Sequence, residues 1–282
     1  MRQVRQIKEV REQLATVRQE GKTIALVPTM GNLHDGHLSL VKQAQECADY
    51  IVVTIFVNPT QFVEGEDFDS YPRTLDSDLS QLNNSDVDLV FIPDNDEIYP
   101  AKSDVLAEVT VPALDSIYCG EYRPGHFKGV ATIVTKLLNI VQPDIAIFGR
   151  KDYQQLLVIR SLVKSLNLPI KIIGAETMRE KDGLAMSSRN QYLTEKERKT
   201  ASLLCETLKK VAKKVEKGAD NHEKLEKEAI SDLKSAGFRP EYLKICDSES
   251  LLVPKQGKLV IIAAAWLGKA RLIDNVAVQP YD

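Results

Sequence analysis

The chain has 282 residues, of which 43% are hydrophobic and 27% charged, and its formal net charge is −3. This length predicts a large domain with a smaller one, and the composition is typical of a globular protein rather than a disordered or membrane-embedded one. Because Lys and Arg do not predominate, the charge argues against nucleic acid as the main partner, whose phosphate backbone needs neutralising.

The N-terminal segment and the cysteines predict a cytoplasmic protein. The first ten residues are charged throughout and lack the apolar core of a signal peptide. No apolar run reaches the roughly 20 residues of a membrane-spanning helix, so we expect no membrane partner. The four cysteines lie far apart without a Cys-x-x-Cys pair, which fits reduced thiols in the cytosol.

Short apolar runs alternate with amphipathic stretches over the first 175 residues. The expected strands are 24–27, 50–57, 88–92, 145–148 and 170–173, and the expected helices are 37–48, 75–83, 130–141 and 153–166. This alternation predicts an α/β fold, a Rossmann-like doubly wound parallel sheet with helices on both faces. The stretch 97–125 is irregular and carries a possible strand at 107–111.

The pattern changes after residue 173. Thr194-Glu-Lys-Glu197 is a capping-box pattern that marks the start of a long charged helix. A second helix is expected at 223–235, followed by strands at 242–246, 259–265 and 270–274. Helices followed by strands predict a second, smaller α+β domain at the C-terminal end, and we place the two domains at 1–175 and 176–282.

Residues 27–37, Val-Pro-Thr-Met-Gly-Asn-Leu-His-Asp-Gly-His, lead from an expected buried strand into a helix. The N-terminus of a helix can hold an anion. Gly31 and Gly36 have the spacing of a P-loop, but His37 and Leu38 stand where that motif needs Lys and a hydroxyl. No G-x-G-x-x-G follows any strand, so a dinucleotide-binding oxidoreductase is also disfavoured.

His34 and His37 are the polar groups that remain on this turn. Both imidazoles can point into the same space, where they can donate hydrogen bonds to phosphate oxygens. The alternative interpretation is a solvated cap with a packing residue or a metal ligand. Neither a Cys nor a third His lies nearby to complete a metal site.

Two further segments carry polar groups. Gly149-Arg-Lys-Asp152 follows an expected strand, so Lys151 can reach the same crevice as the histidines, whereas Asp152 can also be only a helix cap. The loop 178–190 has two hydroxyls and an Arg and suits a lid that closes over a polyphosphate. An ordinary polar linker is the alternative for this loop.

Several motifs together resemble a known family. His34-Asp-Gly-His37 resembles the HIGH signature, and Met186-Ser-Ser-Arg-Asn190 resembles a variant of the KMSKS loop, both found in nucleotidyltransferases and aminoacyl-tRNA synthetases. Within that superfamily the chain is similar, over nearly its whole length, to the pantothenate synthetase (pantoate–β-alanine ligase) family. The motifs that match in order are Val27–Gly31, Phe56–Phe62, Tyr71–Thr74, Arg123–Phe127, Gly149–Gln155 and Gly183–Asn190.

The resemblance implies an ATP-dependent, AMP-forming condensation of pantoate with β-alanine to pantothenate through a pantoyl adenylate. It also implies Mg²⁺ held mainly through the ATP phosphates, and a homodimer. One alternative is a nucleotidyltransferase that adenylates another small acid or a phosphate acceptor, and a non-enzymatic alternative is a nucleotide-sensing module. An aminoacyl-tRNA synthetase is disfavoured because an anticodon-binding extension and a basic surface are lacking.

The resemblance also assigns site residues. The catalytic residues would be His37, usually the proton donor, with His34, Lys151 and Arg189. Gln61 and Gln155 would bind pantoate, with Asn58 near the same pocket and β-alanine entering there. Contacts with ATP are implied for Met30, Gly31, Asn32, Leu33, His34, Asp35, Gly36, His37, Gly149, Arg150, Lys151, Asp152, Met178, Met186, Ser187, Ser188 and Arg189. Met178 stands where Val is common, which matters little if this residue contacts adenine through its backbone.

Overall fold

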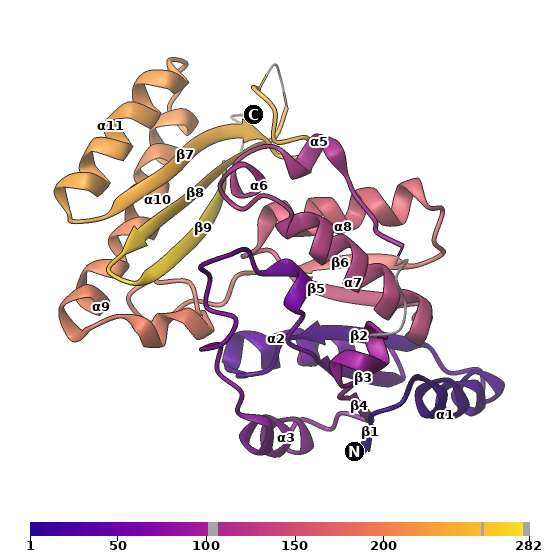
Figure 1. Cartoon of the computed structure of the whole chain (residues 1–282). Helices are drawn as coiled ribbons and strands as arrows, with labels where there is room; N and C mark the ends of the chain where they lie inside the picture. Colours follow the sequence, from indigo (N-terminus) through magenta and orange to yellow (C-terminus); the bar gives the residue numbers. More distant parts are fainter. Residues whose placement is uncertain (101–106, 255–256, 279–282) are drawn as a thin grey trace. The chain divides into compact units, whose positions relative to one another are not determined.

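The computed structural model describes residues 1–100, 107–254 and 257–278 (Figure 1). The chain divides into two units, of which the first contains Met1–Arg150 and Val158–Glu176. The second contains Lys151–Leu157 and Thr177–Asp282. The sequence instead placed one boundary between residues 175 and 176, which is the end of the last strand of the first unit. Each unit is described below by itself.

The first unit is built on a six-stranded sheet in which every pairing is parallel. The strand order is β1-β4-β3-β2-β5-β6, so the chain runs outward from β2 and then returns to the other side of it at β5. In open α/β sheets, ligands bind at the carboxyl ends of the strands where the order reverses, here β2 and β5. The strands are β1 (Arg2–Val4), β2 (Ile24–Thr29), β3 (Tyr50–Ile55), β4 (Leu89–Phe91), β5 (Ile145–Gly149) and β6 (Lys171–Ala175).

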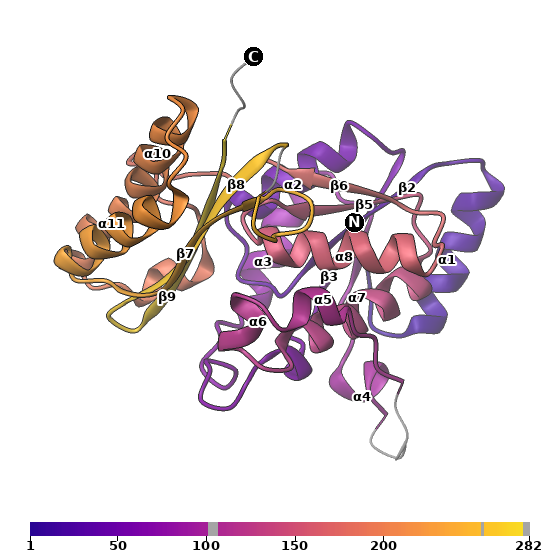
Figure 2. The same cartoon turned by 90° about the horizontal axis from the view of Figure 1, so that it is seen from above.

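Both faces of this sheet are covered, which is why its strands are continuously apolar. One core cluster joins Val27, Val53 and Ile147 of the sheet to Val41 and Leu82 of helices α2 and α3. Helices α1 and α7 contact each other, and α7 contacts β2 (Figure 2). The helices are α1 (Ile7–Gln19), α2 (Asp35–Gln45), α3 (Leu75–Asn83), α4 (Asn95–Ile98), α5 (Pro112–Asp115), α6 (Cys119–Tyr122), α7 (His126–Val141) and α8 (Tyr153–Ser165), the last of which begins within the second unit.

The second unit is a three-stranded antiparallel sheet, β7-β8-β9, with helices on one face. Helices α10 and α11 lie side by side and contact β9 and β7 (Figure 1). Leu208, Leu233 and Ile261 are among the buried residues of its core. The elements are η2 (Ser188–Tyr192), α9 (Glu195–Ala201), α10 (Leu203–Glu216), α11 (His222–Ser235), β7 (Arg239–Asp247), β8 (Leu259–Leu267) and β9 (Ala270–Val278).

The predicted fold class is confirmed, with three corrections in detail. The predicted strand at 107–111 is wrong, because those residues are irregular and the Val109 N–H donates to the Thr132 hydroxyl at 2.9 Å rather than to a neighbouring strand. The predicted long helix does begin at the Thr194 capping box but is interrupted at Ser202. The edge strand β1 is an addition to the prediction. Within the described ranges, no helix is both long and apolar enough to cross a membrane.

Candidate nucleotide and acid site

The histidine segment and the Gly149 segment stand at the same edge of the sheet. β2 and β5 are neighbouring parallel strands, paired at Ala25 with Ile145. β2 ends at Thr29 and leads through a short loop into α2, and β5 ends at Gly149 and leads to Arg150. The structure therefore brings residues 30–37 and 149–150 to the switch point of the sheet, where the topology expects a ligand.

The loop between β2 and α2 turns through two left-handed residues, Gly31 with φ +78° and Asn32 with φ +49°. A Cβ on Gly31 would lie 3.0 Å from Oδ2 of Asp78 and 3.2 Å from Cγ2 of Ile55. Glycine is thus required at this position for both conformation and space. The tight turn delivers the chain to the N-cap of α2 immediately afterwards.

Asp78 of α3 holds this loop by hydrogen bonds, and it was not predicted as a site residue. It is 1% exposed, and its carboxylate accepts the N–H groups of Asn32 at 2.9 Å and Leu33 at 2.8 Å. The Thr74 hydroxyl adds a third hydrogen bond at 3.2 Å. The signal was present in the sequence, because Asp78 shares the helix face of Leu75 and Leu82, and an acid on a buried face needs partners.

The two histidines are fixed by the backbone of their own turn. His34 is the N-cap of α2, and its Nδ1 accepts the Gly36 N–H at 3.1 Å. The Nδ1 of His37 accepts the His34 N–H at 3.3 Å, which completes a capping box, and the ring centroids are 4.2 Å apart. Because Nδ1 is the acceptor in both rings, the neutral imidazoles carry their N–H at Nε2. Two ring donors and the positive end of the α2 dipole thus belong to one turn.

Gln61 lies on a short 3₁₀ turn, η1 (Pro59–Gln61), in contact with the histidine loop. Its side-chain Nε2 donates to Sδ of Met30 at 3.1 Å. Its Oε1 accepts from Nδ2 of Asn58 at 3.0 Å, and Asn58 is 1% exposed. Oδ1 of Asn58 accepts from the Tyr99 and Thr60 hydroxyls at 2.8 and 2.9 Å, and burial raises the pKa of Tyr99, which keeps its donor proton. The predicted group of Met30, Asn58 and Gln61 is therefore contiguous.

Lys151, Asp152 and Gln155 belong to the second unit. All three are partly buried. The Lys151 carbonyl accepts from Nδ2 of Asn275 at 3.0 Å, and the Tyr153 hydroxyl donates to the Ser248 carbonyl at 2.8 Å. Arg150, on the other side of the division, is paired with Glu176. The backbone at the start of α8 is thus tied to β9 and to the residues after β7.

The loop that contains Met186–Arg189 is a hairpin braced against β9. Arg179 pairs with Ala185 as an isolated bridge, and the Met186 N–H donates to the Met178 carbonyl at 3.0 Å. The Arg179 guanidinium binds the Asp274 carboxylate with two hydrogen bonds of 2.7 and 2.9 Å. Burial lowers and the Asp274 carboxylate raises the pKa of Arg179, with a net upward shift, so the guanidinium stays charged.

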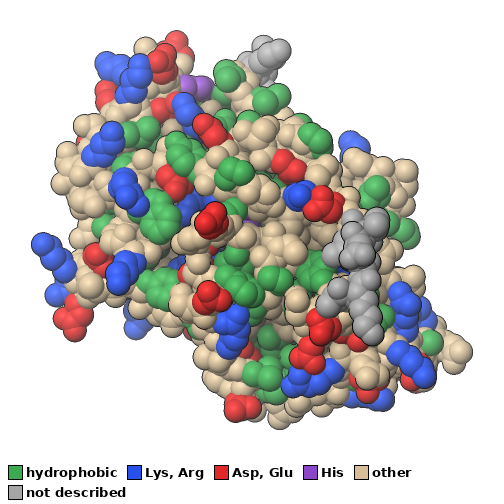
Figure 3. Space-filling view, viewed as in Figure 1, with side chains coloured by type: hydrophobic (Ala, Val, Ile, Leu, Met, Phe, Trp, Pro, Cys, Tyr) green, Lys and Arg blue, Asp and Glu red, His purple; other side chains and the backbone are tan. Residues whose placement is uncertain are grey.

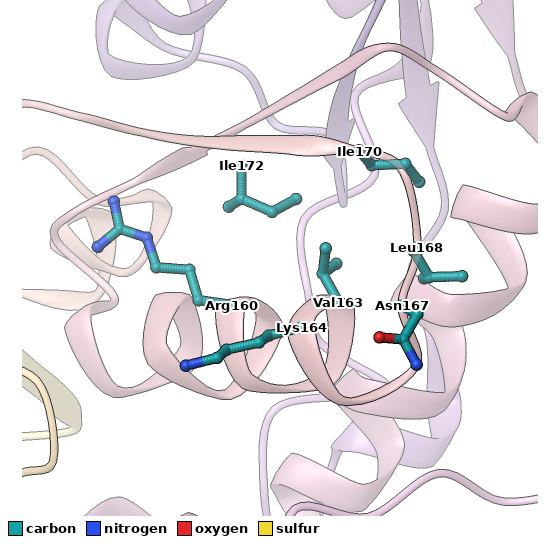
Figure 4. Close-up of a pocket in the computed structure, with 7 residues that line it drawn as sticks. All are labelled: Arg160, Val163, Lys164, Asn167, Leu168, Ile170 and Ile172. Atoms are coloured by element: carbon teal, nitrogen blue, oxygen red, sulfur yellow. The ribbon is translucent and has the colours of Figure 1, made fainter.

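A pocket of about 460 Å³ lies elsewhere, between α8 and β6 (Figure 4). It contains none of the predicted site residues, and its lining is aliphatic apart from three side chains that carry nitrogen donors. The lining residues are Arg160, Val163, Lys164, Asn167, Leu168, Ile170 and Ile172. No carboxylate, hydroxyl or imidazole lines this pocket, so it offers fewer groups for catalysis than the switch point of the sheet does.

Comparison with known proteins decides the family. The family model for pantoate-beta-alanine ligase matches residues 2–277. The chain belongs to the pantoate-beta-alanine ligase family. It is 50% identical over 281 residues to a pantothenate synthetase of Pseudomonas aeruginosa, covering 99% of each chain.

Two solved structures of pantoate-beta-alanine ligases resemble the chain over nearly its full length. That of Thermus thermophilus pantothenate synthetase has a TM-score of 0.92 at 40% identity, with 99% and 100% of the two chains covered. That of the Francisella tularensis pantoate-beta-alanine ligase, complexed with beta-gamma ATP and β-alanine, has a TM-score of 0.81 at 35% identity, with 98% and 97% covered. The predicted resemblance is confirmed, and the predicted enzyme class is that of this family.

The predicted site residues of this pantoate-beta-alanine ligase family member fall into two sets. In the first unit, residues 30–37 share the switch point with Gly149 and Arg150, and Gln61 contacts Met30. In the second unit, residues 151–155 and 178–189 are each tied to β9. Among the described residues, no group of three or more His, Cys, Asp or Glu side chains could hold a metal ion.

Proposed function

We propose that this chain condenses pantoate with β-alanine at the expense of ATP, giving pantothenate, AMP and pyrophosphate through a pantoyl adenylate. The contact between Met30 and Gln61 carries the proposal. It joins the segment proposed to bind ATP to the glutamine proposed to bind pantoate. A carboxylate bound beside Gln61 would then adjoin the phosphates of a nucleotide bound at the histidine turn.

In the first step, a carboxylate oxygen of pantoate attacks the α-phosphorus of ATP, and the bond to the β-phosphate oxygen breaks. Negative charge develops on the phosphate oxygens in the transition state. The Nε2–H groups of His34 and His37 and the N-terminus of α2 are donors suited to that charge. Pyrophosphate leaves, and His37 is the residue we assign the donor role, through a hydrogen bond from its Nε2–H to the departing phosphate oxygen.

In the second step, the amine of β-alanine attacks the acyl carbon of the adenylate. The new C–N bond replaces the bond to AMP, and the nitrogen loses a proton. No covalent bond to the protein forms, so binding, orientation and exclusion of water make the main contributions. The donors and acceptors of Gln61 and Gln155 suit the hydroxyls and carboxylate of pantoate.

Residues of the second unit are proposed to complete the nucleotide contacts. Lys151 and Arg189 supply positive charge, and Ser187, Ser188 and the backbone of Met178 and Met186 supply hydrogen bonds. The brace of Arg179 against Asp274 supports this proposal, because a loop that is already shaped loses less conformational entropy on binding.

Mg²⁺ is proposed to bind through the ATP phosphates. The residues present fit this arrangement, since Mg²⁺ often uses few protein carboxylates and the buried carboxylate of Asp78 is already occupied by two backbone N–H groups. The chemistry that Mg²⁺ supplies is neutralisation of phosphate charge. Chelation with EDTA should abolish turnover, and excess Mg²⁺ should restore it.

The decisive experiment is exchange of labelled pyrophosphate into ATP without β-alanine. We expect exchange that requires pantoate, because formation of the adenylate is reversible. Absence of exchange in folded protein that makes pantothenate would refute the adenylate. Exchange driven by another acid or by a phosphate-bearing acceptor would favour the alternative nucleotidyltransferase, and release of ADP would indicate another class of ligase.

The homodimer, the cytoplasmic location and the lack of a nucleic-acid partner stay predictions. Basic and acidic side chains are interspersed on the face seen in Figure 3, which supports the last of these. Sedimentation equilibrium tests the dimer, and a sedimentation profile of a monomer at micromolar concentration would contradict it.

A further inference from the structure

We infer that His126 is a positioning residue which, backed by Arg123 and Glu66, fixes the backbone of the η1 turn and so presents Gln61 to the acid substrate. This inference rests on the proposed function, because it concerns the glutamine assigned to pantoate. The three residues lie on two segments of the first unit, and nothing above gives them a role in the reaction.

His126 is the first residue of α7 and is only 6% exposed. Its Nδ1 lies 2.7 Å from the carbonyl oxygen of Gln61. A carbonyl only accepts, so the ring proton resides on Nδ1, and Nε2 accepts from Nη1 of Arg123 at 2.9 Å. The neutral ring with its proton on Nδ1 is therefore the form that binds the turn. It is the opposite tautomer to that of His34 and His37.

Arg123 is itself held by a carboxylate. Its Nη2 binds Oε2 of Glu66 at 2.8 Å while its Nε binds Oε1, and the two side chains are 13% and 15% exposed. Oε2 of Glu66 also accepts the Val63 N–H at 3.2 Å, just beyond the turn. A two-pronged pair of this kind fixes the guanidinium in direction as well as distance. The carboxylate orients the guanidinium, which orients the imidazole, which binds the Gln61 carbonyl. We call Glu66, Arg123 and His126 the clamp.

Helix α7, which begins at His126, also packs directly against the η1 turn. A Cβ on Gly129 would lie 2.2 Å from the Thr60 carbonyl oxygen and 2.7 Å from Cα of Gln61, so the turn rests directly on the α7 backbone. Asn58 adds a hydrogen bond from Nδ2 to the Gly129 carbonyl at 3.3 Å. The turn is thus held against α7 by contact and by the imidazole. Nη2 of Arg123 also lies 3.5 Å from the Gln61 carbonyl oxygen, so loss of the imidazole would leave this carbonyl with only a long hydrogen bond and would loosen the residue that carries the glutamine side chain.

The test compares His126→Ala with His126→Asn. An Asn amide nitrogen occupies a place close to Nδ1 of histidine and can still donate to the Gln61 carbonyl, whereas Ala cannot. We expect His126→Ala to raise KM for pantoate about tenfold, the effect of one lost hydrogen bond. KM for ATP should stay within about twofold, and His126→Asn should recover most of the loss. Thr135→Ala is the matched control on the same helix, since the Thr135 hydroxyl donates to the Ala131 carbonyl at 2.7 Å, and it should leave both constants unchanged.

A second readout needs no substrate and separates this inference from the proposed function. The Phe62 N–H closes the turn by donating to the Pro59 carbonyl at 3.2 Å. Its amide hydrogen exchange should be faster in His126→Ala and near the wild-type rate in His126→Asn and Thr135→Ala. Faster exchange in a protein with no pantoate-dependent activity would uphold the clamp and refute the proposed function.

Two results would overturn the inference. One is an unchanged KM for pantoate and unchanged Phe62 exchange in folded His126→Ala, and the other is equal defects in the Ala and Asn variants. If His126→Ala does not fold, Arg123→Lys tests the same clamp, because lysine keeps the charge but lacks the fork that reaches both Glu66 and His126. We expect a smaller rise in KM for pantoate there, and an unchanged constant would equally contradict the clamp.

Discussion

Substitution of Asp78 by Asn tests whether one buried carboxylate shapes the histidine turn. The carboxylate accepts two backbone N–H groups at 2.9 and 2.8 Å. Asn retains one acceptor oxygen but presents an NH₂ group to the other N–H. One hydrogen bond to a charged group is lost and one buried donor is left unpaired, which together cost about 2–4 kcal/mol of unfolding free energy.

The expected effect on activity follows from the position of the loop. Gly31 and Asn32 adopt left-handed conformations shortly before the N-cap histidine, so release of the Asn32 and Leu33 N–H groups lets His34 and His37 move. Misplacement of catalytic groups by about 1 Å can cost about 100-fold, and we expect kcat/KM for ATP to fall between about 10- and 100-fold in Asp78→Asn. Urea unfolding and the pyrophosphate exchange assay measure the two effects.

Asp76→Asn is the matched control. Asp76 lies in the first turn of the same helix, undergoes the same change of charge and is exposed. Its loss removes only a favourable interaction with the helix dipole, worth at most about 1 kcal/mol. Equal unfolding free energies for the two variants, or normal turnover in Asp78→Asn, would refute the reasoning about the loop.

Three further predictions concern other contacts. Arg179→Lys loses the two-pronged bond to the buried Asp274 carboxylate and should lower the unfolding free energy by about 2–4 kcal/mol, as seen by urea denaturation. Gly129→Ala should lower the melting temperature, because the added Cβ would overlap the η1 turn. Ala on its own favours a helix over Gly by about 1 kcal/mol, so a higher melting temperature would contradict that packing. A hydrogen bond from Arg198 lowers the pKa of Asp182, so the stability it adds is present above about pH 4 and is lost as the pH falls further. Asp182→Asn should therefore be less stable than wild type at pH 7 by less than about 1 kcal/mol, since both side chains are more than a third exposed to solvent. The two unfolding curves should converge in acid.

The sequence predicted the sheet well because its strands are buried on both faces. Runs such as 24–27 and 145–148 are apolar without alternation, and this pattern identifies them as strands whichever strands they pair with. The edge strand β1 was missed because it has three residues, of which only Val4 is buried. The run at 107–111 has strand-like residues, but the Val109 N–H donates to the Thr132 hydroxyl and not to a partner strand. Strand propensity alone does not supply that partner.

The start of α2 shows how local chemistry shifted a boundary. The sequence placed the helix at 37–48, whereas it begins at Asp35 because His34 is its N-cap. Histidine is not among the usual N-cap residues, so the pattern gave no reason to begin earlier. The capping box made by two imidazoles is visible only once both rings are placed, and it is this arrangement that fixes their tautomers.

The residues proposed to touch substrates lie in short local motifs, whereas the residues that hold them in place act through contacts with distant parts of the sequence. Asp78 binds a backbone group 45 residues away, His126 one 65 residues away, and Arg179 a carboxylate 95 residues away. Two of these three bind main-chain atoms, which every residue has, so no pairing of side-chain types along the sequence could reveal them. His126 shows the consequence most clearly. Its motif helped to identify the family, yet its part in presenting Gln61 follows only from a 2.7 Å contact with a carbonyl oxygen and from the lack of space at Gly129.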